Sequence, residues 1–374
     1  MLLVNNPDTI LPNWRKVSQV KSAQTENDLA SDTNSQWRLA RTPPGGLPVA
    51  EDFEWVQGEI PEPRHGQMLT RTVYLSLDPY QWMRRRTGVE ATGDLCHGRT
   101  VSQVMKSQMP DYAEGDFVFN TNGWQSHGLT GADISEFGYM HPRKLDADLA
   151  PLSTAIGVLG MLGLTAYAGL IVQCQPNPGE TVVVSAASGG VGQVVGQLAK
   201  LSGCRVVGIA GAAQKCSFVT AELGFDACVS HLAEDLPEQL ALACPDGCDI
   251  YFENVGGKVF EAVLPVLNPA SRIALCGFIS QYANTDGGNP RDLWQQTGQA
   301  TFDRQQVTLH DLFVGNFVDD YQAQFLSEMS DYVRDGRVQY REHRWQGLDK
   351  APEAFRALFQ GGNFGKSIVV VSEE

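Results

Sequence analysis

A glycine-rich turn between a predicted strand and a predicted helix constrains this chain more than any other feature. The β-branched run 181–185 enters the spacing Ala187-x-Gly189-x-x-Gly192, and an amphipathic stretch follows to residue 200. Glycines at such a turn let backbone N–H groups approach a pyrophosphate at the N-terminus of a helix. Because repeated strand–helix units follow, the turn predicts a dinucleotide-binding fold. The alternative is a surface turn that is merely rich in glycine.

The end of the next predicted strand indicates which dinucleotide is held. After the strand 204–209 come residues 210–213, all alanine or glycine, where an NAD-binding fold usually has an acid for the ribose 2′-hydroxyl. A carboxylate would repel a 2′-phosphate, whereas small residues leave room for one. Lys215 follows in the first turn of the next predicted helix, where it either neutralises the phosphate or is only a solvated cation. We therefore predict NADP(H) rather than NAD(H).

Length and patterning predict a two-domain protein. Short alternating strands broken by Pro and Gly turns fill residues 36–156 and predict a β-rich barrel domain. From 157 to 318, apolar strands alternate with helices, as in a doubly wound parallel sheet. The last segment, 319–374, is expected to return to the barrel. Residues 1–35 are polar and without periodicity, which predicts a disordered extension.

Composition narrows the partners and the location. A net charge of −15 argues against nucleic acid or an anionic membrane as a partner. No apolar run is long enough to cross a bilayer, and no basic-then-apolar leader is recognisable. Cys244 and Cys248 are the only close cysteine pair in the sequence, and no second pair completes a zinc site. We expect reduced thiols in a cytoplasmic protein.

Several motifs between Trp37 and Val371 are specific in combination. They are Leu75-Ser-Leu-Asp-Pro-Tyr80, Leu164-Thr-Ala-Tyr167, Ala187-Ser-Gly-Gly-Val-Gly192, Glu253-Asn-Val-Gly-Gly257, Cys276-Gly-Phe-Ile-Ser-Gln-Tyr282 and Gly362-Asn-Phe-Gly-Lys366. With them the chain resembles the zinc-free branch of the medium-chain dehydrogenase/reductase superfamily, specifically the double-bond reductases typified by prostaglandin/leukotriene reductases and curcumin reductase. The resemblance implies an α/β fold with a Rossmann domain and a GroES-like catalytic barrel, NADP(H) as cofactor and a homodimer. An apolar strand expected near 313–318 would extend one sheet into that of the second copy.

The resemblance also assigns cofactor contacts. The glycine turn would hold the pyrophosphate, Lys215 the 2′-phosphate, and Asn254 the ribose and nicotinamide side. His231 stands where prostaglandin reductases have a tyrosine near the adenosine phosphate, and it either binds phosphate or is structural. The implied cofactor-binding residues are Gly189, Gly190, Val191, Gly192, Lys215, His231, Asn254, Cys276, Gly277, Phe278, Ile279, Ser280, Tyr282, Phe317, Val318 and Asn363.

The residues that hold a catalytic metal in zinc alcohol dehydrogenases are missing from the sequence. It contains no Gly-His-Glu and no four-cysteine lobe, so we expect no metal. Reduction of the activated C=C bond of a small enone or enal fits better, with hydride reaching the β-carbon and a donor stabilising charge on the carbonyl oxygen. Tyr282 is the first candidate for that donor or for a proton relay, unless it only packs on the nicotinamide, and Tyr80 is the second. A quinone oxidoreductase on this scaffold and a non-catalytic NADPH-binding protein are the alternatives.

Overall fold

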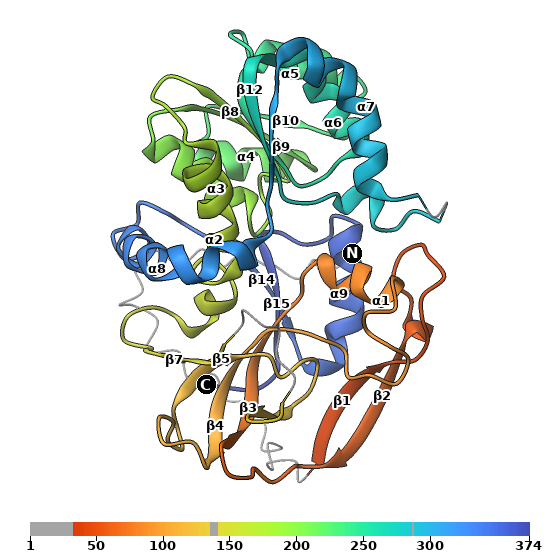
Figure 1. The fold of residues 1–374 in the computed structure, drawn as a ribbon, viewed down its shortest axis with the longest axis vertical. Helices are drawn as coiled ribbons and strands as arrows, with labels where there is room; N and C mark the ends of the chain where they lie inside the picture. The colour runs from red at the N-terminus through yellow and green to blue at the C-terminus, as the bar shows by residue number, and fades with distance from the viewer. Residues whose placement is uncertain (1–32, 135–140, 286–287) are drawn as a thin grey trace, which may run out of the picture.

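The computed structural model describes residues 33–134, 141–285 and 288–374. Two large sheets organise these residues, one in the upper part of the view and one in the lower part (Figure 1). No described helix combines the length and the apolar character needed to cross a membrane.

The upper sheet has six parallel strands in the order β10-β9-β8-β11-β12-β13. The strands are β8 (Thr181–Ser185), β9 (Arg205–Ala210), β10 (Ala227–Ser230), β11 (Cys248–Glu253), β12 (Leu267–Leu275) and β13 (Thr308–Asp311). The chain runs outward from β8 to β10 on one side and from β11 to β13 on the other. This is the Rossmann arrangement, whose ligand crevice lies beyond the carboxyl ends of β8 and β11, where the strand order reverses. The predicted doubly wound sheet is confirmed.

Helices cover both faces of this sheet. They are α2 (Met161–Tyr167), α3 (Gly192–Leu201), α4 (Ala213–Ala221), α5 (Leu236–Ala243), α6 (Gly257–Val263), α7 (Pro290–Gln305) and α8 (Val318–Arg334). Alternation along β8 sends Val182 and Val184 into the core with α2, α3 and α8, and Val183 into the core with α5, α6 and α7. A strand buried on both faces requires the continuous β-branched run seen in the sequence.

The lower sheet has seven strands, in the order β14-β15-β3-β4-β5-β7 with β6 also paired to β3. They are β3 (Gln67–Ser76), β4 (Thr100–Ser107), β5 (Phe117–Asn120), β6 (His127–Gly131), β7 (Arg143–Leu145), β14 (Glu342–Gln346) and β15 (Lys366–Val370). Helices α1 (Tyr80–Arg86) and α9 (Ala351–Phe359) pack beside it around buried Trp82 and Phe355. Strands β14 and β15 come from the end of the chain, which thus returns to the lower sheet through the pairing of β15 with β3 (Figure 1).

Most of the predicted extension 1–35 lies outside the described residues, but its end does not. Strand β1 (Thr33–Leu39) begins at Thr33 and pairs with β2 (Phe53–Glu59), so the boundary predicted after residue 35 is too late. The polar side chains here are held by hydrogen bonds: buried Asn34 donates through Nδ2 to Gln125 Oε1 at 3.0 Å. A strand satisfied by polar contacts gives no hydrophobic signal in the sequence.

The apolar strand predicted near 313–318 is not present. Val314–Phe317 is a 3₁₀-helix, and α8 begins at Val318. Val314 is buried against the core under α2 and α8, so its side chain serves helix packing rather than a sheet ladder. The edge strand of the parallel sheet is instead the more polar β13.

Candidate active site

The glycine-rich turn lies where β8 ends and α3 begins. A Cβ at Gly192 would lie 2.3 Å from Ala186 O, which is backbone, so only glycine fits there. A Cβ at Gly190 would lie 2.2 Å from Leu162 Cδ2, at the end of a side chain on α2. These close approaches place the N-terminus of α3 at the crevice.

The C-terminal segment closes over the same turn. Gly189 forms a β-bridge with Gly365, whose N–H donates to Ser188 O at 3.1 Å. Asn363 lies two residues earlier and donates through Nδ2 to Gly365 O at 2.8 Å. Val191 is the residue that precedes α3. The structure therefore brings Asn363 beside the glycine turn, although Asn363 comes 171 positions after Gly192 in the sequence.

Asn254 bridges the two strands at the point where the sheet order reverses. Its backbone N–H donates to Ser185 Oγ at 2.8 Å, and its Nδ2 donates to Ser185 O at 2.7 Å. Beneath it, buried Glu253 accepts from Tyr251 Oη at 2.9 Å, from Trp294 Nε1 at 3.0 Å and from two backbone N–H groups of the following turn at 2.7 and 3.0 Å. Burial raises the pKa of Glu253, while these donors oppose the rise. The carboxyl group thus holds the turn that carries Asn254.

A group of cationic and imidazole side chains lies at the end of β9. A Cβ at Gly211 would lie 3.4 Å from His231 Nε2 and 3.9 Å from Lys215 Cδ, so these two side chains flank the glycine. Lys215 Nζ donates to Gly361 O at 2.8 Å. Burial, and then the positive charges of Lys258 and Lys215, lower the pKa of His231, which is neutral at pH 7. The structure adds Lys258 to the predicted pair, and this corner suits a 2′-phosphate.

The predicted run 276–282 lies against the turn that carries Asn254. The Cys276 and Gly277 N–H groups donate to Glu253 O at 2.9 and 3.1 Å, and Ile279 N donates to Asn254 O at 3.2 Å. Ser280 Oγ donates to the carbonyl of the residue after Asn254 at 2.6 Å. Burial raises the pKa of the Cys276 thiol to about 12, so that thiol is neutral at pH 7.

Tyr282 lies between the two halves of the molecule. Its ring packs against both the core of the parallel sheet and the core around α1 and α9. Its hydroxyl oxygen accepts from Phe278 N at 3.3 Å, and burial raises its pKa. Arg86 on α1 donates to Tyr282 O. Among the described residues, no acceptor forms a hydrogen bond with the Tyr282 hydroxyl hydrogen, so the hydroxyl can donate to a ligand.

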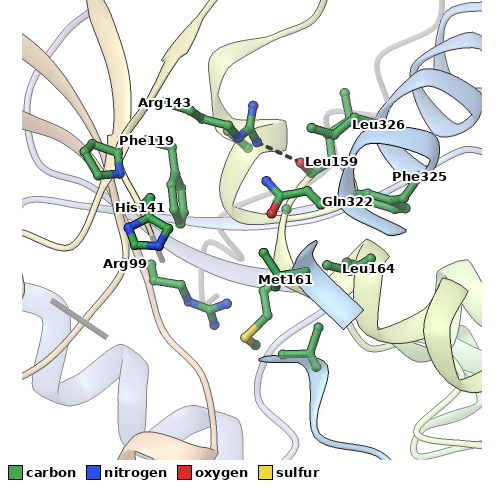
Figure 2. Close-up of a pocket in the computed structure, with 15 residues that line it drawn as sticks. Arg99, Phe119, His141, Arg143, Leu159, Met161, Leu164, Gln322, Phe325 and Leu326 are labelled. Carbon is green, nitrogen blue, oxygen red and sulfur yellow. Dashed lines mark hydrogen bonds between the residues drawn. The ribbon is translucent and has the colours of Figure 1, made fainter. Parts of the chain in front are cut away.

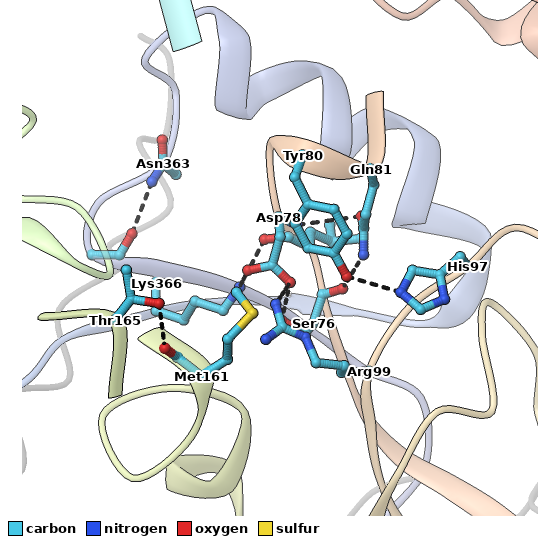
Figure 3. Close-up of polar contacts among 12 residues, drawn as sticks. Ser76, Asp78, Tyr80, Gln81, His97, Arg99, Met161, Thr165, Asn363 and Lys366 are labelled. Atoms are coloured by element: carbon cyan, nitrogen blue, oxygen red, sulfur yellow. Dashed lines mark hydrogen bonds and ion pairs between the residues drawn. The ribbon is translucent and has the colours of Figure 1, made fainter. Parts of the chain in front are cut away.

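On the barrel side, one buried carboxylate joins two buried cations (Figure 3). Asp78 lies 2.9 Å from Lys366 Nζ and 2.7 Å from Arg99 NH2, and it accepts from Ser76 Oγ at 2.6 Å. Burial disfavours its charge, but Arg99 and Lys366 outweigh burial and hold the pKa of Asp78 well below its usual range. Lys366 also donates to Leu77 O at 2.7 Å. A charge network therefore links β3, β4 and β15 beside the glycine turn.

Tyr80 is paired with a histidine in the same region (Figure 3). Its hydroxyl lies 2.8 Å from His97 Nε2, and the Arg99 guanidinium lies 5.5 Å from the centre of its ring. Burial, with help from Arg84 and Arg99, lowers the pKa of His97 to about 3, so the imidazole is neutral. In the tautomer with hydrogen on Nε2, His97 donates to Tyr80, and in the other tautomer Tyr80 donates to His97.

A cavity of about 160 Å³ adjoins this network between the lower sheet, α2 and α8 (Figure 2). Apolar side chains make most of its wall, including Phe119, Met161 and Phe325. Arg99 also lines it, which connects the cavity to the Asp78 network. Of the implied cofactor-binding residues Phe317 and Val318, Val318 lines the cavity and Phe317 packs against Tyr321 with ring centres 6.1 Å apart.

Sequence reasoning missed residues that act in pairs. Asp78 and Lys366 each belong to a motif, but nothing in the motifs shows that they meet across 288 residues. Arg99 and His97 carry no motif at all. Among the described residues, no group of three or more His, Cys, Asp or Glu side chains is arranged to hold a metal ion.

A Rossmann crevice that faces a second, β-rich unit, with a cationic corner and an apolar cavity nearby, defines a nucleotide-dependent oxidoreductase. Family models agree: residues 35–135 match the N-terminal domain of oxidoreductases, and residues 190–331 match a family described as zinc-binding dehydrogenase. The chain belongs to the zinc-independent branch of the medium-chain dehydrogenase/reductases, among the double-bond reductases.

Individual relatives are similar over nearly their whole lengths. The NADPH-dependent curcumin reductase of Escherichia coli is 44% identical, with 91% of this chain and 97% of the relative covered. The 2-alkenal reductase (NADP(+)-dependent) of Nicotiana tabacum is 36% identical over 92% and 100%. The crystal structure of CurA from Vibrio vulnificus in complex with NADPH is 41% identical, covers 91% of this chain and 100% of that chain, and superposes with a TM-score of 0.81.

Proposed function

We propose that this protein reduces the activated C=C bond of α,β-unsaturated ketones and aldehydes with NADPH, without a metal ion. Its relatives include an NADPH-dependent curcumin reductase and a 2-alkenal reductase. The observation that carries the proposal is the donor set between the two sheets. Tyr282 packs against the cores of both halves of the molecule, and Tyr80 lies beside Arg99, whose side chain lines the apolar cavity. No group of metal-ligating side chains occurs among the described residues.

The residues present fit the cofactor. The Gly192 turn has the backbone space that a pyrophosphate needs, and the Lys215 and His231 corner has the donors that a 2′-phosphate needs. Asn254 and the run 276–282 would contact the ribose and the nicotinamide. The bound cofactor supplies the hydride.

The protein's own groups would orient the substrate and stabilise charge. The cavity takes the apolar part of the enone and excludes water from it, which strengthens every hydrogen bond to the carbonyl oxygen. Tyr282 or Tyr80 donates to that oxygen as negative charge develops. His97 orients Tyr80 for this task, and Asp78 holds the side chains of Lys366 and Arg99 in place behind it.

The proposal is tested by NADPH oxidation against a panel of an aliphatic enal, an aryl enone, a quinone and an allylic alcohol, with product masses. We expect turnover of the enal and enone and formation of saturated carbonyl compounds. Turnover of the quinone alone would support a quinone oxidoreductase instead. Tight NADPH binding with no oxidation by any compound would support a non-catalytic role.

Replacing Lys215 by alanine is expected to raise the KM for NADPH by about 10- to 100-fold, because a charged hydrogen bond to the 2′-phosphate is lost. The KM for NADH should stay almost unchanged, since NADH has no phosphate there. Steady-state kinetics with both cofactors measures this. Lys200→Ala, which removes an exposed cation paired with Asp226, is the matched control. A wild-type enzyme that uses both cofactors equally well would contradict the assignment.

Replacing Tyr282 by phenylalanine is expected to lower kcat on an aryl enone by about 10- to 100-fold with little change in NADPH affinity. The reason is that its hydroxyl acts on developing charge rather than on the cofactor. Tyr80→Phe is measured in parallel. If Tyr282→Phe keeps the wild-type rate and Tyr80→Phe does not, the donor is Tyr80 with His97 as its positioning residue.

Assembly and location follow as further proposals. We expect a homodimer in which edge strand β13 and exposed Phe313 lie at the contact. Light scattering should give about twice the 40.8 kDa chain mass. A monomer mass at micromolar concentration would count against this.

The free thiols favour a cytoplasmic location.

A further inference from the structure

Two thiols that take no part in the proposed reaction lie in contact near the cationic corner. Cys216 is on α4 and Cys228 is on β10, and their Sγ atoms are 2.9 Å apart. A disulfide needs about 2.05 Å between the sulfurs, so closure requires less than about 1 Å of movement. No motif in the sequence indicates this pair, because α4 and β10 meet only in the folded protein.

The two thiols differ in reactivity. The hydrogen bond from Cys228 lowers the pKa of half-buried Cys216. The same contact and burial raise the pKa of Cys228, which stays protonated. Burial raises the pKa of the remaining thiols, for example to about 11 for Cys204. Cys216 is thus the thiol with the most thiolate and with solvent access, the two properties that favour reaction with peroxides.

We propose that Cys216 is an oxidation site for peroxides and that Cys228 is its resolving partner. The Cys216 thiolate attacks a peroxide oxygen: an S–O bond forms, the O–O bond breaks, and with one proton the peroxide's other oxygen leaves as water. The Cys228 sulfur then attacks the sulfenic sulfur, an S–S bond forms, and the S–O bond breaks. The departing oxygen takes the Cys228 proton and leaves as water. The two thiols lose two electrons, which reduce one peroxide, and a dithiol reductant restores them.

The disulfide has a protective consequence, and this part rests on the proposed function. Cys216 is adjacent to Lys215 in the chain, at the corner that suits a 2′-phosphate. A sulfinate on Cys216 would add a negative charge there and repel the phosphate, whereas a disulfide is neutral. Cys228 therefore keeps the NADPH site usable under oxidation by intercepting the sulfenic acid.

The test uses the full chain treated with hydrogen peroxide, followed by alkylation of free thiols, digestion and mass spectrometry. In the wild type we expect a peptide linked between Cys216 and Cys228 as the first product, reversed by dithiothreitol. Cys204→Ser, which removes a buried thiol elsewhere, should form the same link. Cys228→Ser should instead accumulate sulfinic acid on Cys216, with the KM for NADPH raised about tenfold and that for NADH unchanged.

Three outcomes overturn the proposal. Oxidation of other cysteines while both thiols of the pair stay reduced would remove the oxidation site. A sulfinic acid on Cys216 in the wild type, with no link, would remove the resolving role. A sulfinylated Cys228→Ser enzyme with an unchanged KM for NADPH would remove the protective role. The mass measurements decide the first two even if the protein shows no reductase activity.

Discussion

Replacing Asp78 by asparagine is expected to lower the free energy of unfolding by about 3–5 kcal/mol, because two buried cations lose their counter-ion. Lys366 Nζ and Arg99 NH2 lie 2.9 and 2.7 Å from its two oxygens, and the three side chains are at most 4% exposed. The measurement is the thermal midpoint and the urea midpoint of the variant against the wild type. Adding Lys366→Met to Asp78→Asn should recover part of the loss, since one uncompensated charge is then removed.

Glu62→Gln is the matched control for this change. It breaks a pair with Lys106 of similar length, 2.7 Å, whose side chains are 74% and 52% exposed. Such exposed pairs contribute less than about 1 kcal/mol. If Asp78→Asn unfolds at the same midpoint as Glu62→Gln, the network does not stabilise the lower sheet.

The same carboxylate predicts a pH dependence. The folded-state pKa of Asp78 lies well below its ordinary value of 3.8. Its stabilising contribution is therefore full above that ordinary value and is lost as the pH falls below it towards the folded-state pKa. The wild type should lose stability on acidification in this range more steeply than Asp78→Asn does.

Replacing Gly192 by alanine is expected to weaken NADPH binding by at least about 100-fold, because the new Cβ would force the turn away from the N-terminus of α3. The obstacle is Ala186 O at 2.3 Å. Fluorescence titration with NADPH measures the affinity, and a thermal melt checks that the variant is folded.

Alanine substitutions at two other glycines are expected to weaken NADPH binding less, in proportion to the space around each glycine. A Cβ at Gly189 would lie 3.1 Å from Ala186 O, so Gly189→Ala should have a smaller effect. A Cβ at Gly58 in β2 would meet nothing within 4 Å, and Gly58→Ala should bind NADPH like the wild type. Wild-type NADPH affinity in Gly192→Ala would contradict the proposed pyrophosphate site. Losses of affinity that do not decrease from Gly192→Ala to Gly189→Ala to Gly58→Ala would contradict it as well.

The Rossmann half was predictable because its signals are local. The run 181–185 and the strand predicted at 204–209 are continuous apolar segments bounded by turns, and the structure has β8 and β9 there. The same logic failed near 313–318, because Val314 is buried under α2 and α8 in a 3₁₀-helix, although the composition of the segment is that of a strand.

The candidate site divides in the same way. Lys215 could be assigned from its place directly after the predicted strand 204–209, and Asn254 was assigned by the resemblance to the double-bond reductases. The pairs Asp78–Lys366 and Tyr80–His97 depend on how the lower sheet folds, and the contact of Cys216 with Cys228 depends on how α4 packs on β10. No local pattern encodes such contacts, which therefore had to be read from the structure.

The most direct test of the central claim follows the hydride itself. The enzyme is given NADPH carrying deuterium at the transferable position of the nicotinamide, together with an aryl enone, and the product is analysed by NMR. The account predicts a saturated ketone with deuterium on the β-carbon. Deuterium on the carbinol carbon of an allylic alcohol would show carbonyl reduction and would contradict it.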